Sequence, residues 1–274
     1  MTTNPAKRRW PGILLSLFVP GFGLVRAGHI GRAVAWFLLS IVLSTVLSLL
    51  FIWRSFPTWA LVIAYGISLG LFILMLVDSF RPGRFTWRMG LIFVLVALTQ
   101  ASIPSPHAII GRAFKMPSDG MYPTLRGPSH GTPPDYVYVN HLSYLFALPA
   151  RGDLAVFKTA GISRIKGDPT FFTQRIVGLP GERIQIRDGH IFANERQLGP
   201  QDGIPDFTYT NPLPDDGPAD RSGTYQVPAD SYFMLGDNSP NSFDSRYWGY
   251  LPSANLYGTV SRIYYPLSRI GAPQ

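Results

Sequence analysis

The stretch Met116-Pro-Ser-Asp-Gly-Met-Tyr-Pro-Thr-Leu125 stands where an apolar first part of the chain gives way to a polar second part. Pro117 and Pro123 bracket it, and each proline fixes its own φ and pushes the residue before it towards extended geometry. We therefore expect an extended backbone, in which Ser118 and Gly120 share one face because strand side chains alternate. Taken alone, the pattern also fits an ordinary surface turn.

Charge divides the chain in the same way. Of the 24 Lys and Arg and the 16 Asp and Glu residues, ten basic residues and one acidic residue lie at or before Arg112, which leaves 14 basic and 15 acidic residues beyond it. The formal net charge of +8 therefore belongs to the apolar part, and we expect no nucleic-acid partner for the rest.

The composition also limits the chemistry. Because the chain has no cysteine, disulfides, thiolate metal sites and cysteine nucleophiles are excluded. The five histidines are scattered without the spacing of a metal-binding pair. We expect no metal and no cofactor.

The first part of the chain reads as a multi-span α-helical membrane anchor. Residues 33–53, 58–80 and 89–103 form apolar runs long enough to cross a bilayer, the last only with its flanks. An earlier run, residues 10–25, is shorter and is broken by Pro20-Gly-Phe-Gly23, which fits a re-entrant or kinked segment.

Arginine bias predicts the orientation of this anchor, because loops rich in Lys and Arg stay on the cytoplasmic side. Three crossings with a re-entrant first segment place everything after about residue 105 outside the cytoplasm, whereas four full crossings place it inside. We favour three crossings, and therefore a multi-pass protein of the cytoplasmic membrane.

The second part reads as a mostly β domain, because short runs of β-branched and aromatic residues alternate with Gly, Pro, Asp and Asn. The expected strands are residues 136–139, 153–157, 175–177, 183–186, 190–192, 232–235 and 259–265. Residues 199–223, rich in Pro, Gly and Asp, are expected to form a long loop or a small excursion from the core.

The stretch at residues 116–125 resembles the nucleophile motif of the type I signal peptidases, Pro-Ser-x-Ser-Met-x-Pro-Thr-Leu. The nucleophilic serine of that motif is replaced by Gly120. Arg151-Gly-Asp-Leu-Ala-Val-Phe157 resembles a second family segment, Gly-Asp-x-x-x-Phe. The resemblance covers about residues 112–265.

Two further segments extend the resemblance. Gln174-Arg-Ile-Val-Gly-Leu-Pro-Gly-Glu182 resembles the segment that supplies the family's lysine general base, and here Gln174 takes the place of that lysine. Gly236-Asp-Asn-Ser-Pro-Asn-Ser-Phe-Asp-Ser-Arg-Tyr-Trp-Gly249 matches a family signature nearly throughout.

The resemblance implies roles for further residues. Ser118 matches the residue whose hydroxyl helps to line the oxyanion hole, and the walls of the pocket for small side chains match Met116, Met121, Leu125 and Thr173. Ser242, Asp244 and Arg246 match a loop that braces the catalytic centre. Read physically, that loop gathers hydroxyls, a carboxylate and a guanidinium, which can form a charge-assisted network.

A serine–lysine hydrolase needs a hydroxyl that attacks a carbonyl and a neutral amine that takes its proton. Glycine at 120 cannot attack, and the amide of Gln174 has no usable basicity near neutral pH. The sequence therefore predicts a homologue without proteolysis, although whether the chain is an enzyme stays open at this point.

One alternative keeps the activity. Ser118 could replace the missing nucleophile, with a base drawn from Lys115, Lys158 and Lys166, the lysines beyond residue 111. Lys115 should point to the opposite face of an extended run, and Lys166 lies in a loop before Gln174 with nothing that demands an inward side chain. A further alternative is a structural membrane protein whose β domain binds no peptide.

We therefore expect a membrane region at residues 1–111 and a signal-peptidase-like β domain at residues 112–270 on the extracytoplasmic side. The resemblance implies signal peptides or preproteins and the lipid bilayer as partners, with an active signal peptidase or the export machinery as further candidates. By β-augmentation, the strand that carries Ser118 could pair with an extended peptide.

Overall fold

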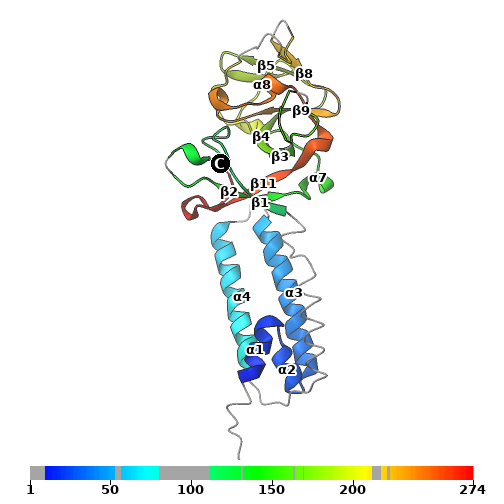
Figure 1. The fold of residues 1–274 in the computed structure, drawn as a ribbon, viewed down its shortest axis with the longest axis vertical. Helices are drawn as coiled ribbons and strands as arrows, with labels where there is room; N and C mark the ends of the chain where they lie inside the picture. The colour runs from blue at the N-terminus through cyan, green and yellow to red at the C-terminus, as the bar shows by residue number, and fades with distance from the viewer. Residues whose placement is uncertain are drawn as a thin grey trace, which may run out of the picture. The chain divides into compact units, whose positions relative to one another are not determined.

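The computed structural model describes residues 10–52, 57–79, 111–130, 132–162, 164–168, 170–211, 217–220 and 223–273. The chain forms two compact units, Met1–Ile109 and Ile110–Gln274, and Figure 1 shows helices in the first and mostly strands in the second. Each unit is described by itself.

The helical unit begins with a broken segment. Helix α1 (Trp10–Phe18) is followed by a turn at Pro20 and Gly21 and then by the short helix α2 (Phe22–Arg26). Gly21 has a φ of 80°, a left-handed conformation that glycine adopts without steric cost. With nine residues, α1 is too short to cross a bilayer by itself.

Two long apolar helices follow, α3 (Ile30–Ile52) and α4 (Thr58–Ser79). Each contains a 22-residue stretch whose length and mean hydropathy of 2.4 and 2.6 would allow it to cross a membrane, a criterion that some soluble core helices also meet. The expected run at residues 89–103 lies outside the described residues.

Polar contacts fix the C-terminal end of α4. Asp78 forms an ion pair with Arg32 of α3 at 2.8 Å and accepts a hydrogen bond from the Trp36 indole at 3.1 Å. The hydroxyl of Ser16 in α1 donates to that of Ser79 at 2.9 Å. Buried polar groups in an apolar environment are stabilised by such partners, so these contacts join α1, α3 and α4.

The β unit contains two antiparallel sheets. The larger has the order β1-β2-β11-β3-β4-β9-β10 and the smaller the order β7-β6-β5-β8. Their bounds are β1 Gly111–Lys115, β2 Tyr136–Asn140, β3 Leu154–Lys158, β4 Phe171–Gly178, β5 Arg183–Arg187, β6 His190–Ala193, β7 Arg196–Gln197, β8 Thr224–Gln226, β9 Ser231–Leu235, β10 Leu251–Pro252 and β11 Leu256–Tyr265.

Short helices connect these strands. The α-helical ones are α7 (Ser143–Phe146) and α8 (Ser245–Trp248), and the 3-10 helices are η2 (Pro128–His130), η3 (Pro200–Asp202), η4 (Ser239–Asn241), η5 (Ser253–Asn255) and η6 (Leu267–Arg269). In the signature at residues 236–249, the chain leaves β9 and then forms the two short helices η4 and α8.

The seven expected strands are confirmed as β2, β3, β4, β5, β6, β9 and β11. Four of them are one residue longer than expected, β3 is shifted by one residue, and β4 and β11 are longer by five and three residues. The short strands β7, β8 and β10 and strand β1 were not predicted. The excursion at 199–223 is only partly a surface loop, because Ile204 and Tyr209 are buried in the core cluster of the smaller sheet.

The extended backbone expected over residues 116–125 is wrong. Strand β1 ends at Lys115, and residues 118–125 form bends and turns, in which the Tyr122 N–H donates to the Asp119 carbonyl at 3.0 Å. The Asp119 carboxylate also accepts from the N–H groups of Gly127 at 2.7 Å and Ser129 at 3.2 Å. Aspartate and glycine favour such turns, and here they outweigh the two prolines.

Candidate functional site

A cavity of about 480 Å³ opens beside the turn that follows β1. Three chain segments meet there: the turn itself, the start of β4 and the chain between η4 and α8. The lining residues are Met116, Pro117, Ser118, Gly120, Met121, Thr170, Phe171, Phe172, Thr173, Gln174, Asn241, Ser242 and Phe243. This set brings together most of the residues that the sequence singled out, from positions more than a hundred residues apart.

Gly120 has room for a side chain. A Cβ placed on it would lie 3.8 Å from the Asn241 carbonyl oxygen, 3.8 Å from Ser242 Oγ and 3.9 Å from Ser118 Oγ, all ordinary van der Waals distances. Its φ lies outside the left-handed region, so the backbone does not require glycine here. The hydroxyls of Ser118 and Ser242 thus flank an unfilled position.

Gln174 lies in β4 with an exposed fraction of 5%. Its Nε2 donates to the Phe243 carbonyl at 2.9 Å, whereas its Oε1 is buried with no hydrogen-bond partner in the described structure. Because a carbonyl oxygen can only accept, this contact fixes which end of the amide faces Phe243. The amide therefore ties β4 to the 241–243 segment and leaves one acceptor unsatisfied.

The remaining predicted pocket residues fall into two groups. Met116, Met121 and Thr173 line the cavity, and both methionines are also buried in the core of the larger sheet. Leu125 is fully buried in the same core and is not among the lining residues. The aromatic walls formed by Phe171, Phe172 and Phe243 were not predicted.

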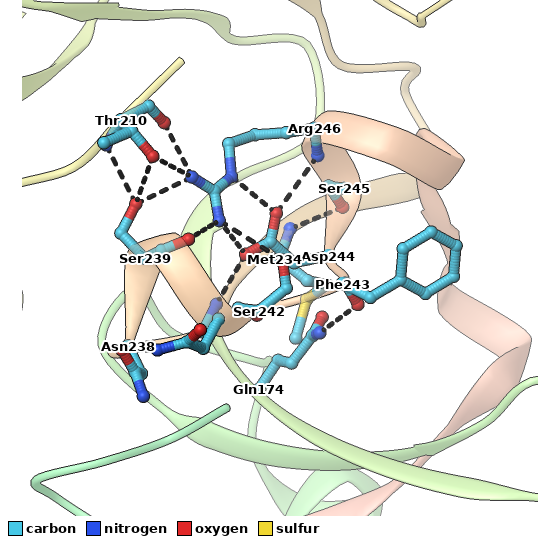
Figure 2. A network of polar contacts seen from close by, with 12 residues as sticks. Gln174, Thr210, Met234, Asn238, Ser239, Ser242, Phe243, Asp244, Ser245 and Arg246 are labelled. Atoms are coloured by element: carbon cyan, nitrogen blue, oxygen red, sulfur yellow. Dashed lines mark hydrogen bonds and ion pairs between the residues drawn. The ribbon is translucent and has the colours of Figure 1, made fainter. Parts of the chain in front are cut away.

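Asp244 and Arg246 form a buried network at the start of α8 (Figure 2). Their side chains have exposed fractions of 0% and pair at 2.8 Å. Figure 2 also shows the guanidinium meeting Thr210 and Ser239, whose oxygen atoms accept from it at 2.6 to 3.2 Å. Burial acts to lower the pKa of Arg246, but the hydrogen bonds and charge of Asp244 outweigh it and raise the pKa overall.

The chain after β9 holds the turn beside the cavity. The Asn238 N–H donates to the Gly120 carbonyl at 3.1 Å, and Asn238 Nδ2 donates to the Asp119 carbonyl at 2.9 Å. A Cβ on Gly236 would collide with the Gly120 carbonyl oxygen and the Ser242 hydroxyl. This close approach requires glycine at 236.

A second buried ion pair lies behind the turn. Arg175 donates to both carboxylate oxygens of Asp237, at 2.8 and 2.6 Å, and the Thr124 hydroxyl donates to one of them at 2.5 Å. All three residues belong to sequence motifs quoted above, so the motifs could have marked them as important. Their contact with one another is set by the tertiary fold and could not be read from the motifs.

The sequence of this chain is similar to those of known proteins. Residues 86–265 match the family model described as signal peptidase, peptidase S26. The chain belongs to the signal peptidase I family. A probable signal peptidase I-2 from Synechocystis is 30% identical over 191 residues, covering 69% of this chain and 78% of that protein. Signal peptidase I from Leptolyngbya laminosa is 34% identical over 168 residues, covering 60% and 74%.

Among solved structures, a signal peptidase I from Enterococcus faecalis is 29% identical and covers 42% of this chain and 97% of its own, with a TM-score of 0.31. That score is too low to add to the argument on the fold. The membership rests on the family model and on the sequence relatives.

The chemistry of the cavity is set by an uncharged lining. None of the thirteen described residues that line it is ionisable. The three lysines weighed above as a substitute base, Lys115, Lys158 and Lys166, are not among them. Within the described residues, no group of three or more His, Asp or Glu side chains is placed to hold a metal ion.

Proposed function

We propose that this signal peptidase I homologue binds signal peptides or preproteins in the cavity beside Gly120 and does not hydrolyse them. The observation that carries the proposal is the uncharged lining, which offers hydrogen-bonding and apolar contacts but no proton acceptor. General-base catalysis needs a group of suitable pKa within hydrogen-bond reach of the attacking hydroxyl. A Ser118 hydroxyl without such a group is a weak nucleophile.

The binding half of the proposal is supported by the shape and chemistry of the cavity. Its methionine and phenylalanine walls suit small apolar side chains, and its serine, threonine and asparagine side chains can hydrogen-bond to a peptide backbone. Because residues 118–125 form bends and turns, they offer no extended strand for β-augmentation by a bound peptide. The alternative of a structural membrane protein whose β domain binds no peptide does not account for an open cavity of this size.

We also propose a membrane region at residues 1–111 that crosses the cytoplasmic membrane three times and places the β domain, residues 112–270, on the extracytoplasmic side. The support is the arginine bias of the loops and the two apolar helices α3 and α4. An active signal peptidase or the export machinery is the proposed partner that would use a bound precursor.

The test of the proposal combines cleavage and binding. The purified full-length protein in detergent is incubated with a preprotein that carries a small-x-small cleavage site, beside the variant Ser118→Ala. We expect photo-crosslinking of the preprotein to cavity residues and no cleavage by either protein. Cleavage by the unmodified protein that is lost in Ser118→Ala would instead establish Ser118 as a relocated nucleophile, and failure to crosslink would overturn the binding function.

A further inference from the structure

Charged residues adjoin the cavity, but none of them is among its described lining residues. Asp119 accepts from the Gly127 and Ser129 N–H groups, Arg175 pairs with Asp237, and Asp244 pairs with Arg246. Lys115, at the end of β1, and Lys158, opposite Phe171, are exposed and are not among the lining residues. A ligand atom in the cavity therefore meets no unpaired cation among the described lining residues.

We expect this uncharged environment to bind a cut and an uncut peptide with different affinities. A peptide that runs through the cavity presents an uncharged carbonyl followed by an N–H group. A peptide that has been cut there ends in a carboxylate, which carries a charge and only acceptor atoms near neutral pH. Burying a carboxylate without a counter-charge is costly, and the hydroxyl of Ser118 replaces only part of its lost hydration.

Gln174 adds a second reason for the difference. Its Oε1 is an acceptor without a partner in the described structure, and its Nε2 is already engaged by the Phe243 carbonyl. This oxygen is buried, so a ligand reaches it only if the amide moves; the N–H of an uncut peptide can then donate to it, whereas a carboxylate cannot. The Oε1 of Gln174 therefore finds a hydrogen-bond donor in the uncut peptide and an unfavourable acceptor in the carboxylate of the cut peptide.

We infer that the cavity selects uncleaved peptides and rejects peptides that end inside it in a free carboxylate. This inference rests on the proposed function and names its ligand class: the intact precursor and not the released signal peptide. A protein with this preference stays free of the accumulating products of active signal peptidases and remains available for precursors.

Three labelled peptides test the inference by fluorescence anisotropy with the full-length protein in detergent. They share one sequence without a long apolar core, so that they stay out of micelles. The first continues past the small-x-small site, the second ends there in a carboxylate, and the third ends there in an amide. We expect the first and third to bind within about threefold of each other and the second at least about tenfold more weakly, since only the second brings in an unpaired charge.

Two variants locate the effect. Gln174→Lys places an ammonium at the cavity and should abolish most of the preference against the carboxylate. Gln185→Lys is the matched control, because Gln185 lies in β5 of the other sheet, also has an unpartnered Oε1, and donates from Nε2 to Thr224 Oγ1 at 2.9 Å. It should leave the preference unchanged.

The outcomes separate this inference from the function on which it rests. Equal affinity for the carboxylate and amide peptides in the unmodified protein would overturn the selectivity while leaving peptide binding intact. Tighter binding of the carboxylate peptide would overturn it as well. If none of the three peptides binds, the proposed function itself fails.

Discussion

At the scale of single residues, Gly120 and Gln174 lie beside the same cavity, and the family resemblance implies that they stand at the positions of a nucleophile and a base. Gly120 leaves an unfilled position between the hydroxyls of Ser118 and Ser242. Gln174 has an amide with no usable basicity, and its Nε2 donates to the Phe243 carbonyl. Neither side chain supplies a nucleophile or a base, and the surroundings of Gly120 leave room for a larger residue.

This arrangement predicts that Gly120→Ser is tolerated. The new Cβ has ordinary contacts and a permitted φ, and replacing glycine restricts the unfolded chain, so we expect a gain of about 0.4–1 kcal/mol in the free energy of unfolding. Thermal unfolding in detergent measures it. The matched control Gly236→Ala, whose Cβ collides with the Gly120 carbonyl, should lose about 1–3 kcal/mol. Equal destabilisation of both variants would contradict the described geometry.

At the scale of elements, strands with strong β-branched and aromatic patterns were predictable because their signal is local. The sequence left both an extended piece and a surface turn open after β1, and the hydrogen bond from Asn238, far along the chain, is part of what favours the turn. Family motifs located Gly120, Gln174 and Ser242 by spacing alone. The phenylalanine walls were missed because Phe171 and Phe243 meet only in the folded protein.

The network at the start of α8 yields a second prediction. Asp244→Asn leaves the fully buried guanidinium of Arg246 without its counter-charge, and removing one partner of a buried pair costs about 3–5 kcal/mol. Chemical or thermal unfolding should show this loss. Glu195→Gln, which breaks the exposed pair with Arg187 at 3.3 Å, is the control and should cost about 1 kcal/mol or less. Similar losses in the two variants would refute the bracing role.

At the scale of the whole molecule, a basic, apolar helical unit is joined to a β unit with nearly balanced charge. The helices α3 and α4 fit a membrane anchor, and the broken segment α1 and α2 packs against them. The distribution of arginines then predicts which side of the membrane the β unit occupies.

Cysteine labelling tests the predicted topology, because the natural chain has no cysteine. Leu148→Cys, at a side chain with an exposed fraction of 90%, should react with a membrane-impermeant maleimide in spheroplasts. Thr3→Cys should react only after permeabilisation. Four crossings predict instead that neither cysteine is labelled while the membrane is intact.

The central claim is that the scaffold of a signal peptidase is intact and only its chemistry is missing. Cleavage of a small-x-small preprotein by the double variant Gly120→Ser with Gln174→Lys tests it most directly, beside each single variant. We predict measurable cleavage by the double variant alone, since nucleophile and base act as a unit. A folded double variant that binds the preprotein and fails to cleave it would contradict the claim that the two substitutions alone abolish activity.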